Sequence, residues 1–399
     1  MHKAQTVICG AGIMGLTIAR ELLSRGHGDI LIIEKEPHTG AHASGRNSGV
    51  LHAGIYYAPG SARAKTCMEG NRLMREYCRE KSLPLGENGK VIVTTAPEQL
   101  AVLDELHRRA LANGADVRMV DEHELADIEP HAKTIDRALH SPRTAVVDPR
   151  AILKSLADDL TATGRVRLFL DTRAIGPRPD GRLDTTAGPV AFGHLINAMG
   201  AHADTLAHAF GIGLDYCFVP FKGAYRQLAP ARAELVRGSI YPVPDIRNPF
   251  LGVHFTRGVH GDVYIGPTAT PAFGRENYHG IDGIGREGLS ILMRDATLFA
   301  ANPKFRSLAV DEVRRMVFAC FFREAQRLVK GLEPTDILPC AKVGIRPQLV
   351  DTRTNELVSD FLVLGTGNST HILNSISPAF TSSMAFARII ADDHLPATV

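Results

Sequence analysis

The first 34 residues combine two short apolar runs with one helical pattern. Thr6–Cys9 and Ile30–Ile33 are apolar enough to be strands that are covered on both faces. Between them, apolar residues recur at helical spacing until Gly26 ends the pattern: Leu16, Ala19, Leu22 and Leu23. The chain is therefore predicted to begin with a strand–helix–strand unit.

The middle of the chain contains both helical patterns and strand patterns. Three helices are predicted there: 97–113, 121–129 and a segment that opens at Asp148-Pro149. Four strands are predicted: Val166–Leu170, Ala191–Asn197, Leu251–Thr256 and Gly261–Gly266. The last two are short extended runs that indicate an antiparallel sheet.

Two segments in the last third are amphipathic. In 310–332 an apolar stripe is accompanied by basic residues: Arg314, Arg315, Arg323, Arg327 and Lys330. A surface helix packed on the core explains this stripe, and so does a basic face that contacts a membrane or an electron-accepting partner. The other segment is a final helix, for which Ser377 is the predicted N-cap and Pro378 the first helical residue.

Composition excludes several classes of protein. The 399 residues contain 45 Lys and Arg against 43 Asp and Glu, and a net charge of +2 gives no electrostatic footprint for nucleic acid. The six cysteines form no CxxC pair and match no zinc-site spacing, so we expect free thiols in a reducing compartment and no metal. There is no apolar window of membrane-spanning length, and glycines interrupt the first apolar run too early for a signal peptide. We therefore expect a cytoplasmic protein.

The turn after the first predicted strand has the chemistry of a dinucleotide site. Gly10 permits a tight turn, Gly12 lets the backbone approach a pyrophosphate, and Gly15 lets the helix pack closely on the strand. The helix N-terminus presents free amides and a positive dipole to the phosphates. Glu34, at the end of the second strand, suits the hydroxyls of a ribose. This acid disfavours NADP, whereas the motif alone leaves NAD and FAD open.

A loop at 40–57 follows this unit and is rich in Gly, Ser and Asn. Its hydroxyls and amides, those of Ser44, Asn47 and Ser48 among them, suit the phosphate oxygens of an extended ligand. A solvated surface loop is the other explanation. The run Val50-Leu51-His52-Ala53-Gly54 is too apolar for that explanation.

Motifs along the whole chain resemble one family of flavoenzymes. Residues 44–61 are similar to the FAD enzymes of the D-amino-acid oxidase superfamily, and within it to the L-2-hydroxyglutarate dehydrogenase/oxidase family. The likeness continues in order: Lys65, Gly70-Asn71-Arg72, Gly86–Val91, Pro220–Tyr225, Tyr241–Asp245, Pro249–Thr256, Gly344–Gln348, Thr370-His371 and Ser377-Pro378-Ala379. It departs at Pro347, where relatives commonly have alanine, and in Asn374–Pro378, where they have Asn-Ala-Pro-Ser-Pro.

The resemblance implies FAD as the cofactor and an α/β fold that is α+β overall. A Rossmann-like FAD-binding domain of the glutathione-reductase type, discontinuous in sequence, is expected beside a substrate domain built on an antiparallel sheet. The FAD-binding domain is expected to comprise 1–80, 145–215 and 340–399. The substrate domain is expected to comprise 81–144 and 216–339.

The cofactor-binding residues that we expect fall into three groups. Those at the adenosine end are implied by the motif and by the resemblance: Gly10, Gly12, Gly15, Glu34, Lys35, Ala174 and Gly200. Those of the loop are Ser44, Asn47, Ser48 and His52. The third group begins the final helix, whose dipole would stabilise negative charge on the reduced flavin: Ser377, Pro378 and Ala379.

Oxidation of a 2-hydroxy acid needs a hydride acceptor, which is flavin N5, and a base for the hydroxyl proton. Three histidines have contexts that suit the base: His52, His254 and His371. For His52, structural support and a link to the flavin are also open. Arg346 is expected to bind a substrate carboxylate in a bidentate way. A dicarboxylate needs further anchors, for which the candidates are Lys222, Tyr241, Thr256, Arg257 and Asn374.

The resemblance favours oxidation of L-2-hydroxyglutarate to 2-oxoglutarate, with electrons passed to a quinone-like or artificial acceptor or to an electron-transfer protein. Two alternatives stay open: an oxygen-using oxidase of another 2-hydroxy or amino acid, and a flavin-containing electron carrier without its own substrate. We expect a small 2-hydroxy dicarboxylate as substrate and no nucleic-acid partner. The segment 310–332 is the candidate for peripheral contact with the inner face of a membrane.

Overall fold

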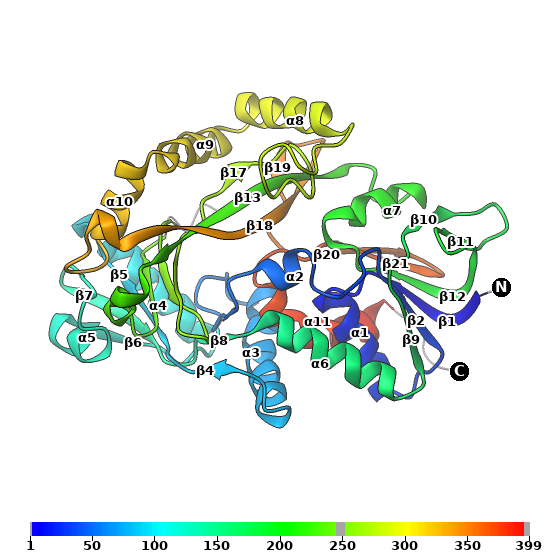
Figure 1. The fold of residues 1–399 in the computed structure, drawn as a ribbon, viewed down its shortest axis with the longest axis horizontal. Coiled ribbons are helices and arrows are strands. Elements are labelled where there is room, and N and C mark those ends of the chain that lie inside the picture. Colours follow the sequence, from blue (N-terminus) through cyan, green and yellow to red (C-terminus); the bar gives the residue numbers. More distant parts are fainter. Residues whose placement is uncertain (1, 245–251, 395–399) are drawn as a thin grey trace.

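The computed structural model describes residues 2–244 and 252–394 (Figure 1). These residues form three sheets, of eight, ten and three strands. The eight-stranded sheet lies at the end of the molecule that holds both termini, and the ten-stranded sheet extends to the other end. No helix in the described part of the chain is long and apolar enough to cross a bilayer.

The predicted strand–helix–strand unit forms the centre of the eight-stranded sheet. It consists of β1 (His2–Cys9), α1 (Ile13–Ser24) and β2 (Ile30–Ile33). Five parallel strands lie in the order β9-β2-β1-β12-β21, where the added strands are β9 (Val166–Phe169), β12 (Val190–Asn197) and β21 (Ser369–Asn374). The strand order reverses between β1 and β12, and doubly wound sheets bind dinucleotides at such a reversal. Three antiparallel strands complete the sheet: β10 (Ala174–Pro177), β11 (Leu183–Thr185) and β20 (Leu362–Thr366).

Helices cover both faces of this sheet because its central strands are apolar on both sides. Ile8 and Ile32 pack with α1 and with three further helices: α3 (Ala62–Glu80), α6 (Pro149–Ala162) and α11 (Ala379–Asp393). Val7 and Leu31 point to the opposite face, which α7 (Ala203–Ala209) covers. The predicted helix start at Asp148-Pro149 is confirmed, because the Asp148 carboxylate accepts hydrogen bonds from two amides of the first turn of α6.

The final helix starts later than predicted. α11 begins at Ala379, and Pro378 occupies the N-cap position with a non-helical backbone. The prediction of Ser377 as N-cap and Pro378 as the first helical residue is therefore wrong by one residue. The α11 terminus carries no side-chain cap, and its first amide, that of Ala379, donates to the carbonyl of Ile376.

The ten-stranded sheet is the antiparallel sheet that the extended runs predicted. Its order is β19-β18-β13-β16-β15-β14-β5-β7-β6, with β17 paired to β13, and only β14 and β5 run parallel. β13 (Tyr216–Leu228) and β18 (Ile337–Asp351) pair along their whole length. The other strands are β5 (Lys90–Val93), β6 (Arg118–Asp121), β7 (Arg137–Ser141), β14 (Ser239–Pro242), β15 (Phe255–Arg257), β16 (Val263–Ile265), β17 (Thr270–Pro271) and β19 (Glu356–Leu357).

Part of the predicted run Leu251–Thr256 falls outside this sheet. β15 starts only at Phe255, and Leu251 lies outside the described residues, as do Asp245, Pro249 and Phe250 of the family motifs. The third sheet consists of β3 (Val50–Leu51), β8 (Ala145–Val147) and β4 (Leu85–Gly86). The domain division stays a prediction, and its boundary at residue 340 falls within β18.

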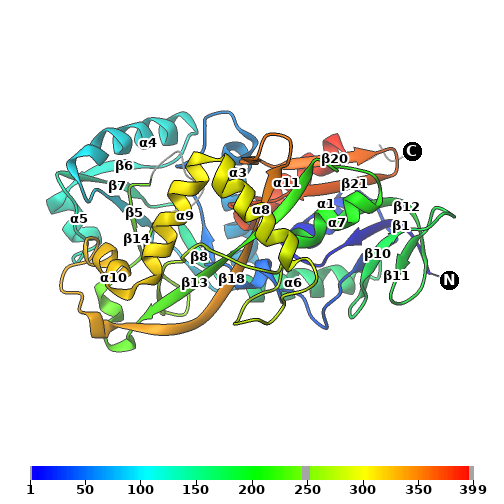
Figure 2. The same ribbon diagram turned by 90° about the horizontal axis from the view of Figure 1, so that it is seen from above.

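Helices pack on both faces of the ten-stranded sheet (Figure 2). The predicted helical segments 97–113 and 121–129 correspond to α4 (Leu100–Ala112) and α5 (Glu122–Ile128). Three more follow, α8 (Gly288–Ala301), α9 (Pro303–Met316) and α10 (Phe318–Gln326). The segment 310–332 is therefore not one helix, because the backbone becomes extended at Val317.

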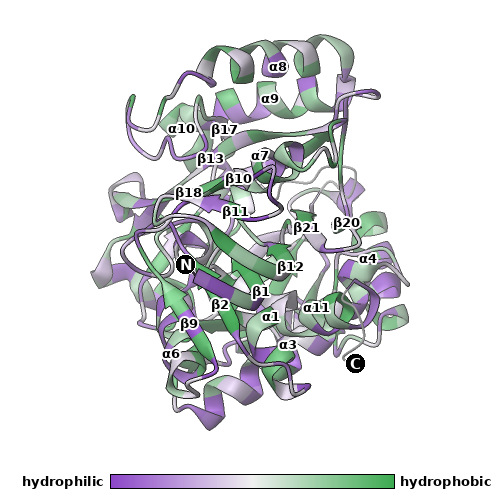
Figure 3. Ribbon diagram, turned by 90° about the vertical axis from the view of Figure 1, so that its right-hand side faces the viewer, coloured by the Kyte–Doolittle hydropathy of each residue, from purple (hydrophilic) through white to green (hydrophobic). Residues whose placement is uncertain are grey.

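The break divides the apolar stripe into two parts with different roles. Its second part is core, because Phe321, Leu328 and Leu332 are buried. Its first part is exposed and continues onto α8, where the exposed apolar side chains are Leu289, Leu292, Met293 and Phe299, joined on α9 and after it by Val310, Val313, Met316 and Val317. We call these eight residues the α8–α9 surface; α8 and α9 form an outer edge of the molecule in Figure 3.

Candidate active site

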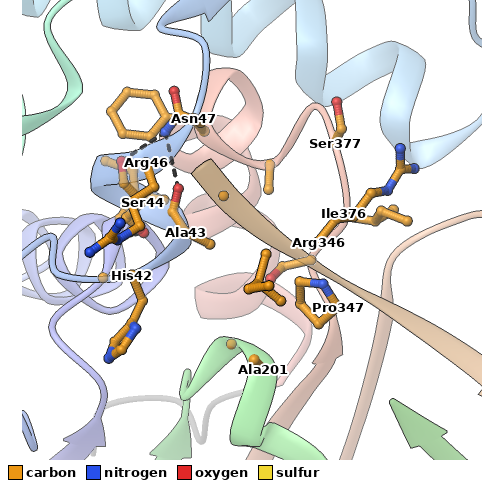
Figure 4. Close-up of a pocket in the computed structure, with 18 of the residues that line it drawn as sticks. His42, Ala43, Ser44, Arg46, Asn47, Ala201, Arg346, Pro347, Ile376 and Ser377 are labelled. Carbon is orange, nitrogen blue, oxygen red and sulfur yellow. Dashed lines mark hydrogen bonds between the residues drawn. The ribbon is translucent and has the colours of Figure 1, made fainter. Parts of the chain in front are cut away.

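A cavity of about 540 Å³ lies between the two large sheets. It extends from the glycine turn after β1, past α2 (Ala43–Arg46) and the start of α11, to Tyr241 and His254 beside the ten-stranded sheet. Figure 4 shows one part of it, with residues of α2 facing Arg346 and Pro347 of β18 across the space. The cavity is elongated, and its two ends differ in chemistry.

The glycine turn has the shape that a pyrophosphate requires. Gly10 has a φ of +108°, and a Cβ added there would lie 2.5 Å from the carbonyl oxygen of Ala198. A Cβ added at Gly15 would lie 1.9 Å from the carbonyl oxygen of Gly10, so α1 approaches β1 closely only because this residue is glycine. Gly10 and Gly12 line the cavity, whereas Gly15 packs behind them. This cradle fits a dinucleotide.

Glu34 lines the same end and is held in place by the backbone. Its carboxylate accepts hydrogen bonds from the amides of Ala11, at 2.9 Å, and Glu36, at 3.1 Å. Glu34 shares this part of the lining with the predicted Lys35, Ala174 and Gly200. A ribose placed above the glycine turn would meet this carboxylate, as the spacing of the motif predicts.

The loop at 40–57 is attached to the glycine turn. The Ser44 hydroxyl accepts a hydrogen bond of 3.0 Å from the amide of Ile13, in the first turn of α1. The Asn47 amide group donates to the carbonyl of Ser44, at 2.7 Å (Figure 4). Its oxygen accepts from the amide of Gly49. Ser44, Asn47 and Ser48 all line the cavity. Two of these polar side chains thus also fix the loop that carries them.

A segment of the ten-stranded part closes over the adenosine end. Glu276 accepts hydrogen bonds from His202, at 2.8 Å, and from Lys35, at 2.7 Å, and the bond from His202 is the main reason why the pKa of Glu276 lies well below its usual range. The hydroxyl of Tyr278 lies 2.8 Å from Nδ1 of His42. We call Glu276 and Tyr278, with the turn that carries them, the clasp.

The clasp is anchored at its base by a buried ion pair. Arg275 contacts the Asp204 carboxylate at 2.5 Å, and both side chains are more than nine-tenths buried. The guanidinium of Arg46 stacks over the ring of Tyr278 at 4.0 Å. The sequence analysis missed the clasp because its contacts join residues that lie 71 or more positions apart. No local periodicity records such contacts.

The other end of the cavity is built from the His52 loop and the start of α11. The backbone amide of His52 donates to the Thr381 hydroxyl at 3.1 Å, which ties the loop to the first turn of α11. Ser377, Pro378 and Ala379 line this end, as predicted, and so does Asn374. The Asn374 amide group donates to two carbonyls, those of Val358 and Asp360, so its position is fixed.

Two of the three predicted histidines reach this end. His254 donates from Nδ1 to the carbonyl of Gly252 at 2.8 Å and stacks on Tyr241, with ring centroids 4.0 Å apart. His52 lines the cavity nearby, and its Nδ1 atom is buried without a hydrogen-bond partner among the described residues. Burial lowers the pKa of His254 to about 4 and that of His52 to about 3. Both rings are therefore neutral in the ligand-free protein at neutral pH.

The third histidine does not reach the cavity. His371 is fully buried in β21, where its ring nitrogens contact Asn197, at 3.1 Å, and Ser369, at 3.1 Å. The contact with Asn197 joins β21 to β12 within the eight-stranded sheet, and the contact with Ser369 lies within β21. The hypothesis that His371 is the base is therefore corrected, because a histidine that holds two central strands together cannot meet a ligand in the cavity.

Three predicted anchors also lie away from the cavity. Arg257 donates to the carbonyls of Ala233 and Val236, and so fastens β15 to the preceding loop. Thr256 is buried behind Tyr241, with 3.4 Å between the two hydroxyl oxygens. Lys222 is on β13 but is not part of the lining. Sequence position alone could not separate these residues from Tyr241 and Arg346, which do line the cavity.

Two arginines give this end a positive charge. Arg346 is half-buried on β18, and burial lowers the pKa of its guanidinium to about 10. Arg63 stacks over the Tyr57 ring at 4.5 Å and donates to the carbonyls of Ser359, at 2.6 Å, and Ser377. Within the described residues, the carboxylates that line the cavity are Glu34 and Glu276, both at the adenosine end. The sequence analysis missed Arg63, which follows the 44–61 motif by two residues.

The comparisons with known proteins agree with this geometry. A family model described as FAD dependent oxidoreductase matches residues 5–393. The chain belongs to this family. FAD is the cofactor of the oxidoreductase, and the cradle at Gly10 together with the carboxylate of Glu34 fits its adenosine end.

Curated relatives resemble the oxidoreductase over nearly its whole length. L-2-hydroxyglutarate dehydrogenase, mitochondrial, of Caenorhabditis elegans is 35% identical, with 98% of this chain and 93% of that protein covered. The human protein of the same name is 34% identical, with 97% and 88% covered. L-2-hydroxyglutarate dehydrogenase of Indibacter alkaliphilus is 33% identical, with 97% and 98% covered. The resemblance stated from the sequence is thereby confirmed.

Solved structures share the fold of the oxidoreductase. FAD-bound L-alpha-glycerophosphate oxidase from Mycoplasma pneumoniae has a TM-score of 0.76 and 22% identity, with 97% of this chain and 94% of that chain covered. Glycine oxidase from Geobacillus kaustophilus has a TM-score of 0.71 and 21% identity, with 98% and 94% covered. The predicted Rossmann-like α/β fold is confirmed.

Proposed function

We propose that this FAD-dependent oxidoreductase oxidises L-2-hydroxyglutarate to 2-oxoglutarate and passes the electrons to a quinone-like acceptor or an electron-transfer protein. The observation that carries the proposal is the end of the cavity opposite the adenosine site. There Arg346 and Arg63 share the lining with two neutral histidines, and none of the described residues brings a carboxylate to this end. An anionic 2-hydroxy acid needs this combination. The names of the curated relatives support the same substrate.

Arg346 is the proposed partner of the substrate carboxylate beside the reacting carbon. A guanidinium in a cavity shielded from bulk water binds a carboxylate in a fixed, bidentate geometry, which orients the carbon between the cofactor and the base. Arg63 adds positive charge at the same end, while its two carbonyl partners hold it against Tyr57. Together they bind an anion and define its orientation.

His254 is the proposed base. Because Nδ1 donates its proton to the Gly252 carbonyl, the neutral ring carries a free electron pair at Nε2, which takes the proton of the substrate hydroxyl. When bound, FAD supplies the acceptor for the hydride that leaves the same carbon. The unpartnered Nδ1 of His52 is available for a hydrogen bond to the substrate or cofactor. The start of α11 contributes its positive dipole to the same space.

A spectrum tests this function. The purified protein, loaded with FAD, is mixed anaerobically with L-2-hydroxyglutarate, and the oxidised flavin absorbance should bleach, while D-2-hydroxyglutarate leaves it intact. An oxidised spectrum at saturating L-2-hydroxyglutarate would refute the proposal. Peroxide released in proportion to turnover in air would instead identify the oxygen-using alternative. Reduction of the flavin by an amino acid would show that the substrate is an amino acid and not a 2-hydroxy acid.

We further propose that the α8–α9 surface contacts an anionic membrane where a quinone-like acceptor resides. Most large exposed apolar side chains of the described residues lie in 273–317, and the cations Arg286, Lys304, Arg306 and Arg314 are exposed among them. Apolar residues flanked by cations favour an anionic lipid surface. This location replaces the predicted 310–332, because the second part of that segment is core.

A further inference from the structure

Lys90 is a buried cation that the proposed mechanism does not use. It lies on β5, is 2% exposed, and its Nζ atom has no hydrogen-bond partner among the described residues. A buried ammonium without a counter-charge costs several kcal/mol in desolvation, and a leucine or methionine in its place would avoid that cost. A residue that lowers stability in this way needs another explanation.

The surroundings of Lys90 are the inner wall of the substrate end. Its Nζ atom lies 4.5 Å from the ring centre of Tyr56 and 5.0 Å from that of Tyr241, and both rings line the cavity. Its charge also acts on the protonation of His52 and His254, which line the same end. The ammonium is therefore one aromatic ring away from the space that a substrate would occupy.

The groups around Lys90 include no carboxylate among the described residues. The titratable neighbours that face it are Cys67 of α3, His52, Tyr56, Tyr241 of β14 and His254. All are neutral at neutral pH, because burial raises the pKa of Cys67 and of Tyr241 to about 12, raises that of Tyr56, and lowers those of the histidines. Among the described residues, no group thus supplies the missing counter-charge.

We propose that Lys90 is the specificity-determining cation that makes the oxidoreductase prefer a substrate with two negative charges over one with a single charge. The inference rests on the proposed function, because it assigns Arg346 to the carboxylate next to the reacting carbon. A second carboxylate at the far end of the substrate then provides the charge that Lys90 lacks. Lys90 acts through the field across Tyr56 and Tyr241, without touching the substrate.

The size of this effect follows from the separation of the charges. One ring between the two groups places them about 7 Å apart, and at an effective permittivity near 20 such a pair changes a binding constant by about 10-fold or more. A monocarboxylate has no charge at that position and gains little. Selection between the two substrate classes therefore depends on Lys90, while affinity for the reacting end depends on Arg346.

The proposal also predicts proton uptake. Burial lowers the pKa of Lys90 to about 7, so the free protein holds this proton only in part at neutral pH. A bound dianion stabilises the ammonium and raises its pKa, so binding takes up a proton between pH 7 and 8. Affinity for a dianion should fall as the pH rises from 6 to 9, because the ammonium is lost, and affinity for a monoanion should change little.

The test compares Lys90→Met with Lys90→Arg in the FAD-loaded protein. Equilibrium binding of 2-oxoglutarate and of the monocarboxylate 2-oxobutyrate is measured from the change in flavin absorbance at pH 6 to 9. Lys90→Met should weaken 2-oxoglutarate binding about 10-fold or more at pH 6.5 and 2-oxobutyrate binding less than 3-fold. Lys90→Arg should retain the preference for 2-oxoglutarate, and its affinity for this ligand should no longer fall towards pH 9. Equal losses for both ligands, or none, would overturn the proposal.

Stability separates this role from a structural one. If Lys90 only holds the fold together, Lys90→Met lowers Tm; if it is an uncompensated charge, Tm is unchanged or raised. The pKa of Lys90 is lower in the folded state than in the unfolded chain, so burial of the ammonium destabilises the fold fully below pH 7. This destabilisation disappears as the pH rises towards the pKa of the unfolded chain. The rise in Tm caused by Lys90→Met should therefore be largest below pH 7.

Two further readouts keep the proposal testable. Should Lys90→Met fail to fold, Lys90→Gln replaces it, and calorimetry of the unmodified protein in buffers of different ionisation enthalpy still reports proton uptake. No uptake on binding 2-oxoglutarate between pH 7 and 8 would contradict the inference. If the unmodified protein is not reduced by L-2-hydroxyglutarate, the proposed function fails. If it is reduced, and Lys90→Met keeps the same ratio of affinities for 2-oxoglutarate and 2-oxobutyrate, only the assignment of Lys90 fails.

Discussion

At the scale of the residue, surroundings decide which of several similar side chains has a role in the site. Arg257 and Arg346 are both arginines on the ten-stranded sheet. Arg257 donates to two backbone carbonyls, whereas Arg346 faces the cavity. His254 and His371 differ in the same way, since one lines the cavity and the other joins two strands. Composition and spacing could nominate all four, but only the packing around each one separates them.

The assignment of the base gives a prediction about pH. His254→Asn, which removes Nε2, should slow flavin reduction by about 100-fold or more, and His52→Asn should slow it less. In the unmodified protein the rate constant should stay level from pH 8 to about 5 and fall below that, because burial keeps His254 neutral until the pH approaches its lowered pKa. Stopped-flow absorbance measures both effects. A larger loss in His52→Asn would assign the base to His52.

Part of the site could be predicted from the residues alone. The roles of Gly10, Gly15 and Glu34 depend on contacts within one strand–helix–strand unit, so their spacing contains most of the information. Lys90 could not be found in this way. Its neighbour Tyr241 is on β14, which pairs with β5 only in the folded sheet, and its neighbour Tyr56 comes from a loop distant in sequence.

At the scale of the element, periodicity predicted the existence of most helices and strands and was less accurate at their ends. The segment 310–332 has one apolar stripe in sequence, but the chain bends at Val317 and forms two helices with different exposure. The start of α11 moved by one residue because Pro378 takes a non-helical backbone. Both differences come from tertiary packing, which overrides local preference.

The clasp predicts slow release of the cofactor. The double variant Glu276→Gln, Tyr278→Phe removes the ion pair with Lys35 and the hydroxyl contact with His42, so FAD should dissociate about 10-fold faster. Rapid dilution of the FAD-loaded protein, followed by flavin fluorescence, measures the rate. Glu105→Gln, which breaks two ion pairs within α4, with Arg108 and Arg109, is the matched control. Equal release rates in all three proteins would show that the clasp does not retain FAD.

At the scale of the whole molecule, the fold class could be predicted because the strand–helix–strand unit of the first 34 residues indicates a doubly wound sheet. The division into domains was harder to predict. Residues 340–351 were expected with the FAD-binding domain, whereas β18 pairs with β13 throughout and carries Arg346 into the cavity from the ten-stranded sheet. Phe218, Leu349 and Leu373 then pack in one cluster that joins the two large sheets.

The α8–α9 surface makes a prediction at this scale as well. Leu292→Glu, Met293→Glu should reduce co-sedimentation with vesicles of anionic phospholipid by about 10-fold, because two charges replace apolar contacts. Leu111→Glu, at an equally exposed site on α4, is the control. The spectrum with L-2-hydroxyglutarate reports whether the substrate end is intact. Unchanged sedimentation of the double variant would exclude this surface as the membrane contact.

The position of α11 has a consequence for how the protein is made. This helix packs on α1 and α3, and its first residues complete one wall of the cavity that starts at Gly10. While the chain is still emerging from the ribosome, the glycine turn is present but that wall is missing until residues 369–393 have left the exit tunnel. The nascent polypeptide therefore cannot hold its flavin before those residues emerge, and coloured protein should appear only once they have.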